Sequence, residues 1–279
     1  MTLTENNKKE FFENGFLIIK SFYDVENEIL PIQKSIYQII DFVIARHSVD
    51  ITREPFKGHN FDNNFQELIA LDEAFGAEIY DLTKQIPSFI RLISSKKAED
   101  VICLLRNTDA PGIGQASYGI RIDNPLDEKF RAHWHQEFIF QPQSMDGIIF
   151  WSPLLTVSKE MGPLNVCLGS HKDGLCIYDK TKYDSKKSGA YTIGIHDEKN
   201  IVSKYKKFHL ECEPGDLIIM DFLTIHQSGL NDSNRSRWSV QSRFFNFKEM
   251  IGAKIGWKAS VTAGSDVEKI FPENFVEKL

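Results

Sequence analysis

The sequence lacks any apolar run that approaches the ~20 residues needed to cross a bilayer. It also lacks an excess of basic residues, because 33 Lys and Arg face 39 Asp and Glu, which gives a net charge of −6. Nucleic-acid-binding proteins usually carry a basic surface. We therefore expect neither a membrane nor a nucleic acid among the partners of this 279-residue chain.

Cysteine is scarce and lacks paired spacing. The four cysteines, Cys103, Cys167, Cys176 and Cys212, form no CxxC motif, so they predict reduced thiols and neither a zinc knuckle nor a disulfide framework. The start "MTLTENNKKEFFENG" is polar and does not resemble a secretory signal. The end "EKL" has Glu277 where the peroxisomal tripeptide needs a small residue. These features predict a cytoplasmic protein.

Internal repeats, low-complexity tracts and Pro/Gly-rich linkers are also missing, which predicts a single domain over residues 1–279. Residues 1–106 have mainly helical patterning. "ENNKKEFFENG" predicts a helix that Gly15 ends, "FLIIKSF" (16–22) a strand, and the stretches 24–47 and 65–86 amphipathic helices.

After residue 110 the pattern changes to short β-prone runs between turn signals, which predicts a β-sandwich or barrel over about 110–250. We expect a mainly β fold with flanking helices. Residues 175–207 interrupt these runs with Lys, Tyr and Ser, as either a functional lid or a solvated surface excursion. The expected strands are "ASYGIRID", "HWHQEFIF", "DGIIFWSPL", "GPLNVCLGS", "KFHLEC", "GDLIIMDF" and "RWSVQSRFFNF".

One of these strands carries titratable side chains. His135 and Glu137 are two residues apart, so on a strand they point to the same face, as do His133 and His135. His226, at the end of an apolar strand in "GDLIIMDFLTIHQSG", is the best third ligand. Two His and one carboxylate on one face leave open positions, as non-haem Fe(II) oxygenases require. HxE alone is weak evidence, since it occurs by chance.

Arg237 lies eleven residues after His226, and this additional match makes a chance occurrence of the whole pattern less plausible. An iron oxygenase of this kind uses a 2-oxo acid, whose remote carboxylate needs a bidentate cation, and Arg suits this better than Lys. Alternation places Arg237, Ser239 and Gln241 on one face, so Ser239 is expected to add a hydroxyl hydrogen bond.

At this point the sequence resembles the phytanoyl-CoA dioxygenase family of Fe(II)/2-oxoglutarate-dependent oxygenases. The family motif W/L-H-Q-D is matched by Trp134–Glu137 ("WHQE"), and its "NGPLxxxPGSHKxG" turn by "MGPLNVCLGSHKDG" (161–174). Its late motif, a "PGD" strand leading to H-x-S-G-x-N and then Arg, is matched by "EPGDLIIMDFLTIHQSGLNDSNRSR". The resemblance covers the ends and residues 110–247 well, and residues 24–106 poorly.

The resemblance implies a double-stranded β-helix (jelly-roll, cupin-like) core. It implies Fe(II) at His135, Glu137 and His226, O2 as co-reactant, and 2-oxoglutarate held by Arg237 and Ser239. It also implies that Trp151 lies beside the cosubstrate and that the strand 118–122 lines its pocket, with Ile120 as the guessed contact.

The chain departs from the family in three places. Glu137 replaces Asp, and its extra methylene moves the carboxylate by over ~1 Å. Cys167 and Leu168 stand where Pro is common, and Arg235 competes with Arg237 as the anchor.

We therefore expect a hydroxylase acting on an unactivated C–H bond of a small metabolite, with 2-oxoglutarate converted to succinate and CO2. Related halogenases lose the carboxylate ligand, so Glu137 argues against halogenation. The alternatives are a jelly-roll metal enzyme of another class, such as a zinc hydrolase or isomerase, and a non-catalytic binding homologue.

Overall fold

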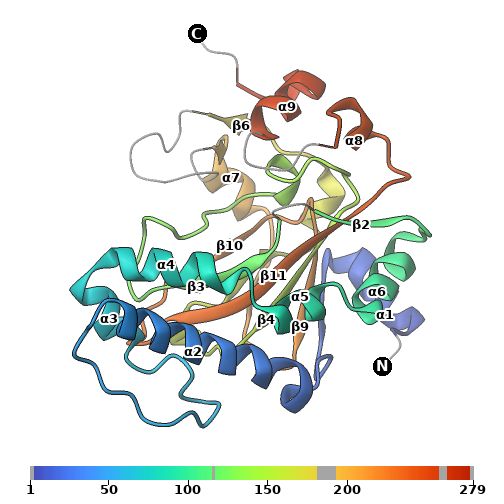
Figure 1. Ribbon diagram of the computed structural model, residues 1–279. Helices are drawn as coiled ribbons and strands as arrows, with labels where there is room; N and C mark the ends of the chain where they lie inside the picture. Colours follow the sequence, from blue (N-terminus) through green and yellow to red (C-terminus); the bar gives the residue numbers. More distant parts are fainter. Residues whose placement is uncertain (1–2, 115–116, 181–192, 258–262, 277–279) are drawn as a thin grey trace.

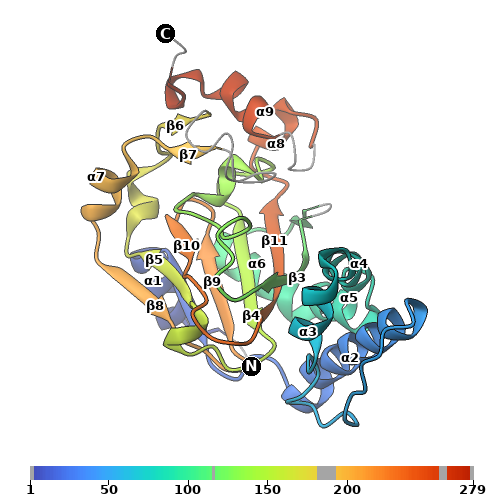
Figure 2. The same cartoon turned by 90° about the vertical axis from the view of Figure 1, so that its left-hand side faces the viewer.

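Two β-sheets face each other, and helices cover the outer side of the larger one (Figures 1 and 2). The computed structural model describes all residues except 1–2, 115–116, 181–192, 258–262 and 277–279. Within that part the larger sheet has the order β1-β9-β4-β11-β2, with β3 also paired to β11, and the smaller has the order β10-β5-β8. The strands of both sheets pair antiparallel.

This arrangement is mainly β with flanking helices, which confirms the expected fold class. The strands are β1 (Phe16–Ile19), β2 (Pro111–Ile113), β3 (Gly119–Asp123), β4 (Ile148–Pro153), β5 (Leu164–Cys167), β6 (Tyr178–Asp179), β7 (Gly194–Ile195), β8 (Lys207–Leu210), β9 (Leu217–Asp221), β10 (His226–Ser228) and β11 (Arg237–Asn246). Six of the seven strands expected after residue 110 form.

The helices follow the sequence signals, with one break that we did not expect. The stretch 65–86 divides at Asp72, which is extended and caps the second helix by accepting from Ala74 N at 2.8 Å. The helices are α1 (Glu5–Asn14), α2 (Leu30–Arg46), α3 (Phe65–Leu71), α4 (Glu73–Thr83), α5 (Pro87–Ile93), α6 (Lys96–Arg106), α7 (Glu198–Ser203), α8 (Ile251–Lys254) and α9 (Ala263–Ile270), with a π-helix, η1 (Val25–Ile29), before α2.

Gly15 ends α1 as predicted. Its φ of 80° lies in the left-handed region that glycine adopts easily, and its N–H donates to Phe11 O at 2.8 Å. The chain then enters β1 directly, which pairs with β9 along the edge of the larger sheet. In this way the sequence "ENGFLII" fixes where the N-terminal helix meets the sheet.

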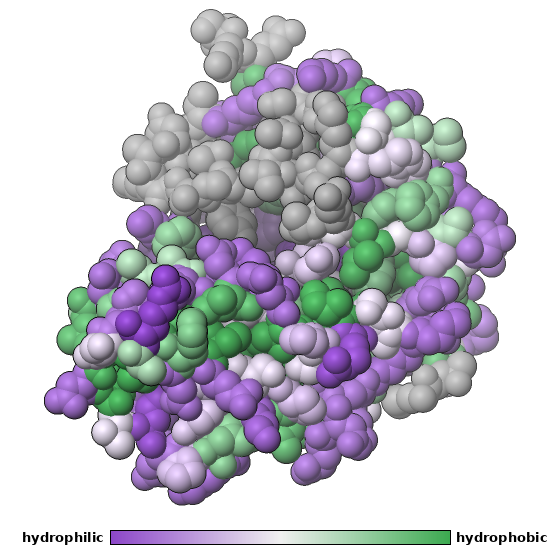
Figure 3. Space-filling view, viewed as in Figure 1, coloured by the Kyte–Doolittle hydropathy of each residue, from purple (hydrophilic) through white to green (hydrophobic). Residues whose placement is uncertain are grey.

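Strand β11 connects the helical layer to the space between the two sheets, because its two faces contact different surroundings. On its outer face Trp238 is fully buried against Phe61 and Phe65, with ring centroids 5.8 and 4.9 Å apart, and its Nε1 donates to Asp62. Its inner face carries the polar series described below. In Figure 3 the face of the helical layer that is turned to the viewer mixes hydrophilic and hydrophobic areas.

Two local expectations around the histidines are wrong. "HWHQEFIF" is not a strand: His135 makes a single antiparallel bridge to His226, and Glu137–Ile139 then form a 3-10 turn, η2. Phe138 and Ile139 are both fully buried, which a turn permits and a half-exposed strand does not. His226 does not end β9 either, because β9 stops at Asp221 and His226 begins β10 in the smaller sheet.

The segment 175–207 is described only at its two ends. Strands β6 and β7 pair with each other, and α7 follows, while residues 181–192 lie outside the described part. The choice between a lid and a surface excursion falls on those residues. No helix in the described ranges is long and apolar enough to cross a membrane.

We predict that the Phe65→Ala variant loses about 3–5 kcal/mol of unfolding free energy, because it opens a cavity between α3 and Trp238. Phe42→Ala on the exposed side of α2 is the control, and it should change the unfolding free energy by no more than about 0.5 kcal/mol. Urea titration measures both. Equal values for the two variants would show that α3 and the sheet do not share one core.

Candidate metal centre

Three buried side chains converge between the two sheets at the His135–His226 bridge. Each of these histidines donates its N–H to the carbonyl of the other at 3.0 Å, which places their side chains on the same side of the pair. Their ring centroids are 4.2 Å apart. Glu137, the first residue of η2, directs Oε2 to within 3.6 Å of His135 Nε2 and 3.7 Å of His226 Nε2.

The backbone fixes which ring nitrogen of each histidine faces the carboxylate. His135 Nδ1 lies 2.6 Å from His133 O, and His226 Nδ1 lies 2.9 Å from Thr224 O. A carbonyl oxygen only accepts, so each Nδ1 carries the hydrogen and each Nε2 of the neutral ring presents a lone pair. The two Nε2 atoms and a Glu137 carboxylate oxygen are thus three acceptors within 4.8 Å of one another, and a cation bound between them would satisfy all three.

The protonation states suit metal binding. Burial lowers the pKa of His226 to about 3, so its ring is neutral at physiological pH. Burial alone would raise the pKa of Glu137, but the Arg243 guanidinium opposes it and holds the pKa below its usual range. The site thus combines a neutral imidazole with an ionised carboxylate, which is the form in which both bind a metal.

The side-chain amide of Gln136, which lies between His135 and Glu137 in the sequence, makes four hydrogen bonds. Its Nε2 donates to Gly174 O and Leu223 O at 2.8 Å, and its Oε1 accepts from Cys176 N at 2.8 Å and Tyr178 Oη at 3.1 Å. The side chain thus fixes the backbone that carries His135 and Glu137.

His133 is not one of the three converging residues. Its backbone oxygen orients His135, and its Nε2 lies 2.8 Å from Ile193 O. The two-residue spacing of His133 and His135 therefore does not add His133 to the converging set.

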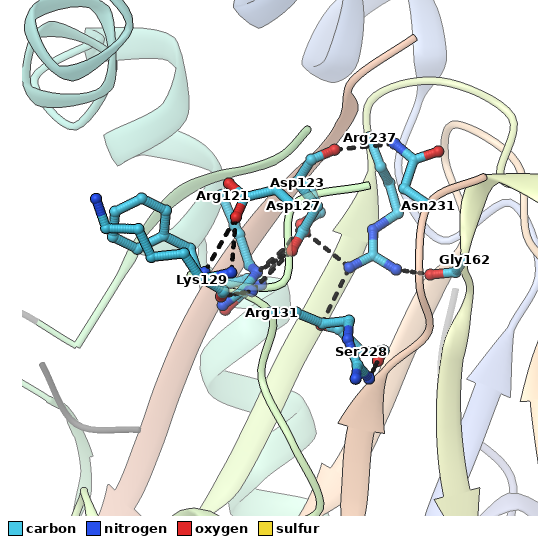
Figure 4. A network of polar contacts seen from close by, with 12 residues as sticks. Arg121, Asp123, Asp127, Lys129, Arg131, Gly162, Ser228, Asn231 and Arg237 are labelled. Carbon is cyan, nitrogen blue, oxygen red and sulfur yellow. Dashed lines mark hydrogen bonds and ion pairs between the residues drawn. The ribbon is translucent and has the colours of Figure 1, made fainter. Parts of the chain in front are cut away.

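Arg237 is fully buried, and Figure 4 shows the polar contacts around it. Its Nη2 donates to Asp123 Oδ2 at 2.7 Å and to Ser228 Oγ at 3.1 Å, and its Nη1 donates to Gly162 O. Arg121 contacts the other oxygen of Asp123 at 2.7 Å. Two guanidinium groups therefore share one carboxylate and leave a net positive charge.

The carboxylate of Asp123 is ionised at physiological pH. Burial would raise its pKa, yet Arg121 and Arg237 outweigh burial and lower the pKa to about 2. Arg235, the rival anchor, points to the helical layer, where its Nε donates to Asp62 at 3.0 Å. Of the two arginines only Arg237 thus faces the space between the sheets.

The other residues expected at the cosubstrate pocket separate into two groups. Trp151 is buried on the inner face of β4, with the Arg237 guanidinium carbon 5.9 Å from its ring centroid. Ser239 shares the inner face of β11, where its Oγ accepts from Gln241 at 3.4 Å. Ile120 pairs with Val240 and so lies on the outer face, with Trp238, which contradicts its guessed contact with the cosubstrate.

Sequence reasoning missed three partners of this site. The hydroxyl that contacts Arg237 is Ser228, two residues after His226 on β10 and therefore on the same face, a signal present in "HQS". Asp123 follows Arg121 in "RID" by the same spacing. Arg243, whose Nε donates to Glu137 Oε1 at 3.0 Å, lies on the face of β11 that alternation gives to Arg237, Ser239 and Gln241, but alternation does not identify Glu137 as its partner.

Facing antiparallel sheets with two His and one carboxylate converging between them define the class of double-stranded β-helix proteins with a metal centre. The chain belongs to the phytanoyl-CoA dioxygenase family, whose sequence profile matches residues 11–239. It is 26% identical over 271 residues to the phytanoyl-CoA dioxygenase domain-containing protein 1 homolog of Dictyostelium discoideum, covering 88% of this chain and 92% of that protein.

Solved structures share the fold. EctD from S. alaskensis with bound Fe superposes with a TM-score of 0.60 at 14% identity, over 99% of this chain and 82% of that one. The α-ketoglutarate-dependent carbocyclase SnoK from nogalamycin biosynthesis gives a TM-score of 0.55 at 12% identity, over 93% and 92%.

We predict that Gln136→Met lowers the unfolding free energy by about 3 kcal/mol or more, because it leaves buried carbonyl and N–H groups without partners, each costing about 1–3 kcal/mol. Gln85→Met, on an exposed position after α4, is the control and should change the unfolding free energy by no more than about 0.5 kcal/mol. If Gln136→Met is also neutral, the side chain does not hold the ligand segment.

Proposed function

We propose that this protein is an Fe(II)- and 2-oxoglutarate-dependent dioxygenase that hydroxylates an unactivated C–H bond of a small metabolite. In the overall reaction the substrate, O2 and 2-oxoglutarate give the alcohol, succinate and CO2. His135, Glu137 and His226 would hold the iron, which supplies the activation of O2.

A buried donor set beside Arg237 is the observation that carries this proposal. Three of the five N–H groups of Arg237 have protein acceptors, whereas its Nε is buried and has none among the described residues. The same is true of Trp151 Nε1. Buried donors without acceptors are costly, so their presence together fits a site that receives a carboxylate.

The polar groups around the donors fit 2-oxoglutarate. Its distal carboxylate would bind Arg237 and Ser228, in place of the Ser239 contact expected from sequence, with Trp151 beside it. The net positive charge of the Arg121, Asp123 and Arg237 group favours an anion there. A zinc hydrolase needs no such anchor, which makes the alternative metal enzyme the weaker reading of the site.

The surroundings of Glu137 favour a substrate with hydrogen-bonding groups. Arg243 lies beside it, Gln241 contacts Arg243 at 2.9 Å, and the buried Ser117 and Gln141 are hydrogen-bonded to each other nearby. Such a polar wall suits a small polar metabolite better than a bare hydrocarbon chain. Screening candidate metabolites for stimulated succinate release identifies the substrate.

Anaerobic addition of Fe(II) and 2-oxoglutarate should produce a weak visible charge-transfer band, and air should then yield succinate. In Arg237→Leu the dissociation constant of 2-oxoglutarate should rise roughly 30–100-fold, since a charge-assisted contact is worth about 2–3 kcal/mol. If neither band nor succinate appears in the wild-type protein, the proposed activity is wrong.

A second variant tests the donor set without altering charge. Trp151→Phe keeps an aromatic side chain but removes Nε1–H, which has no protein acceptor, together with the five-membered ring of the indole. We expect the smaller buried ring to lower the thermal stability, and 2-oxoglutarate to bind about tenfold more weakly. A loss of stability with unchanged 2-oxoglutarate affinity would show that Nε1 does not contact the cosubstrate.

A further inference from the structure

The two oxygens of Glu137 have different partners. Oε2 faces both imidazoles, at 3.6 Å from His135 Nε2 and 3.7 Å from His226 Nε2. Oε1 accepts from Arg243 Nε at 3.0 Å. The carboxylate is therefore divided between the metal-binding side of the site and a guanidinium group.

Arg243 is held in place by the protein around it. Its Nη2 donates to Gln241 Oε1 at 2.9 Å, its Nη1 makes a longer contact of 3.4 Å with Ser117 O, and its backbone oxygen accepts from Gly114 N. The side chains of Arg243 and Glu137 are 19% and 5% exposed. An ion pair this well shielded is screened little by salt, and its geometry is fixed before any ligand arrives.

We propose that Arg243 is a positioning residue that restricts Glu137 to one metal-binding oxygen. This inference rests on the function proposed above. A carboxylate can bind a metal through one oxygen or two, and a second oxygen from Glu137 would occupy a position that 2-oxoglutarate or O2 needs. With Oε1 bound to Arg243, only Oε2 remains for the metal.

The length of Glu137 gives Arg243 this role. A glutamate has one more rotatable bond than the family's aspartate, so its carboxylate is less fixed by its own backbone. The extra methylene also carries Oε1 to the inner face of β11, where Arg243 stands two residues beyond Gln241. Shortening the side chain by about 1.5 Å would take Oε1 out of hydrogen-bond range.

The test compares full-length wild-type protein with Arg243→Met, using Co(II) as an air-stable probe of the metal site and 2-oxoglutarate as the second ligand. We expect Arg243→Met to weaken 2-oxoglutarate binding to the Co(II)-loaded protein about tenfold or more. Co(II) affinity should change by a smaller factor. The Co(II) d–d spectrum without 2-oxoglutarate should also differ from that of the wild type, because Glu137 then binds through both oxygens.

Two further variants sharpen the result. In a Glu137→Asp background, Arg243→Met should have no additional effect on 2-oxoglutarate affinity, because the shorter carboxylate no longer reaches position 243. Arg46→Met, which removes an exposed ion pair with Glu78 between α2 and α4, is the matched control and should leave both affinities unchanged. If Arg243→Met does not fold, Arg243→Lys serves instead, with a smaller loss in the same direction.

Two outcomes would overturn the inference. A large loss of Co(II) affinity with normal 2-oxoglutarate binding to the loaded protein would mean that Arg243 only orients the ligand. Unchanged affinities for both would mean that the pair with Glu137 exists only in the metal-free protein. Failure of the wild type to bind Co(II) and 2-oxoglutarate would instead overturn the proposed function.

Discussion

The backbone pair between His135 and His226 is the constraint on which the site depends. Two hydrogen bonds of 3.0 Å join residues that lie ninety-one positions apart, at the place where the chain passes from the larger sheet to the smaller one. Because both imidazoles leave the pair on the same side, the separation of their rings is set by the backbone and not by side-chain flexibility. The carbonyls of His133 and Thr224 then fix the ring orientations.

Buried charge is the second organising feature. Arg237, Asp123 and Glu137 are all nearly or fully buried, and each is stable there because it has an opposite charge in contact. Each ion-pair group contains one arginine from the inner face of β11, Arg237 at its first residue and Arg243 six residues later. One surrounds the proposed cosubstrate anchor, the other a proposed metal ligand, so a single strand sets the electrostatics of the whole site.

The sequence predicted the three converging residues and the buried arginine from local signals, namely the two-residue spacing of His135 and Glu137, the strand end at His226 and the offset of Arg237 from His226. The spacing argument assumes strand alternation, which is a local rule. It erred where tertiary packing overrides that rule. Glu137 converges with the histidines from a 3-10 turn and not from a strand, because Phe138 and Ile139 both need burial.

Which residues these side chains contact could not be predicted, for a different reason. Asp123, Ser228 and Arg243 come to the site through pairing between distant strands, and sequence alternation states which face a residue occupies but not which strand lies opposite. Ile120 is an example of an error of this kind, because the register of β3 with β11 places its side chain on the outer face of the sheet. A register shift of one residue would reverse that result.

The hydrogen bonds of Gln136 have a consequence for how such a protein changes in evolution. Three of its four partners, Gly174 O, Leu223 O and Cys176 N, are backbone groups, of which only the N–H at position 176 would be lost, and only on substitution by proline. The side chains at positions 176 and 223 can therefore change while these hydrogen bonds and the two neighbouring ligands stay in place. Variation of the side chains next to the ligand segment is thus compatible with an unchanged placement of His135 and Glu137.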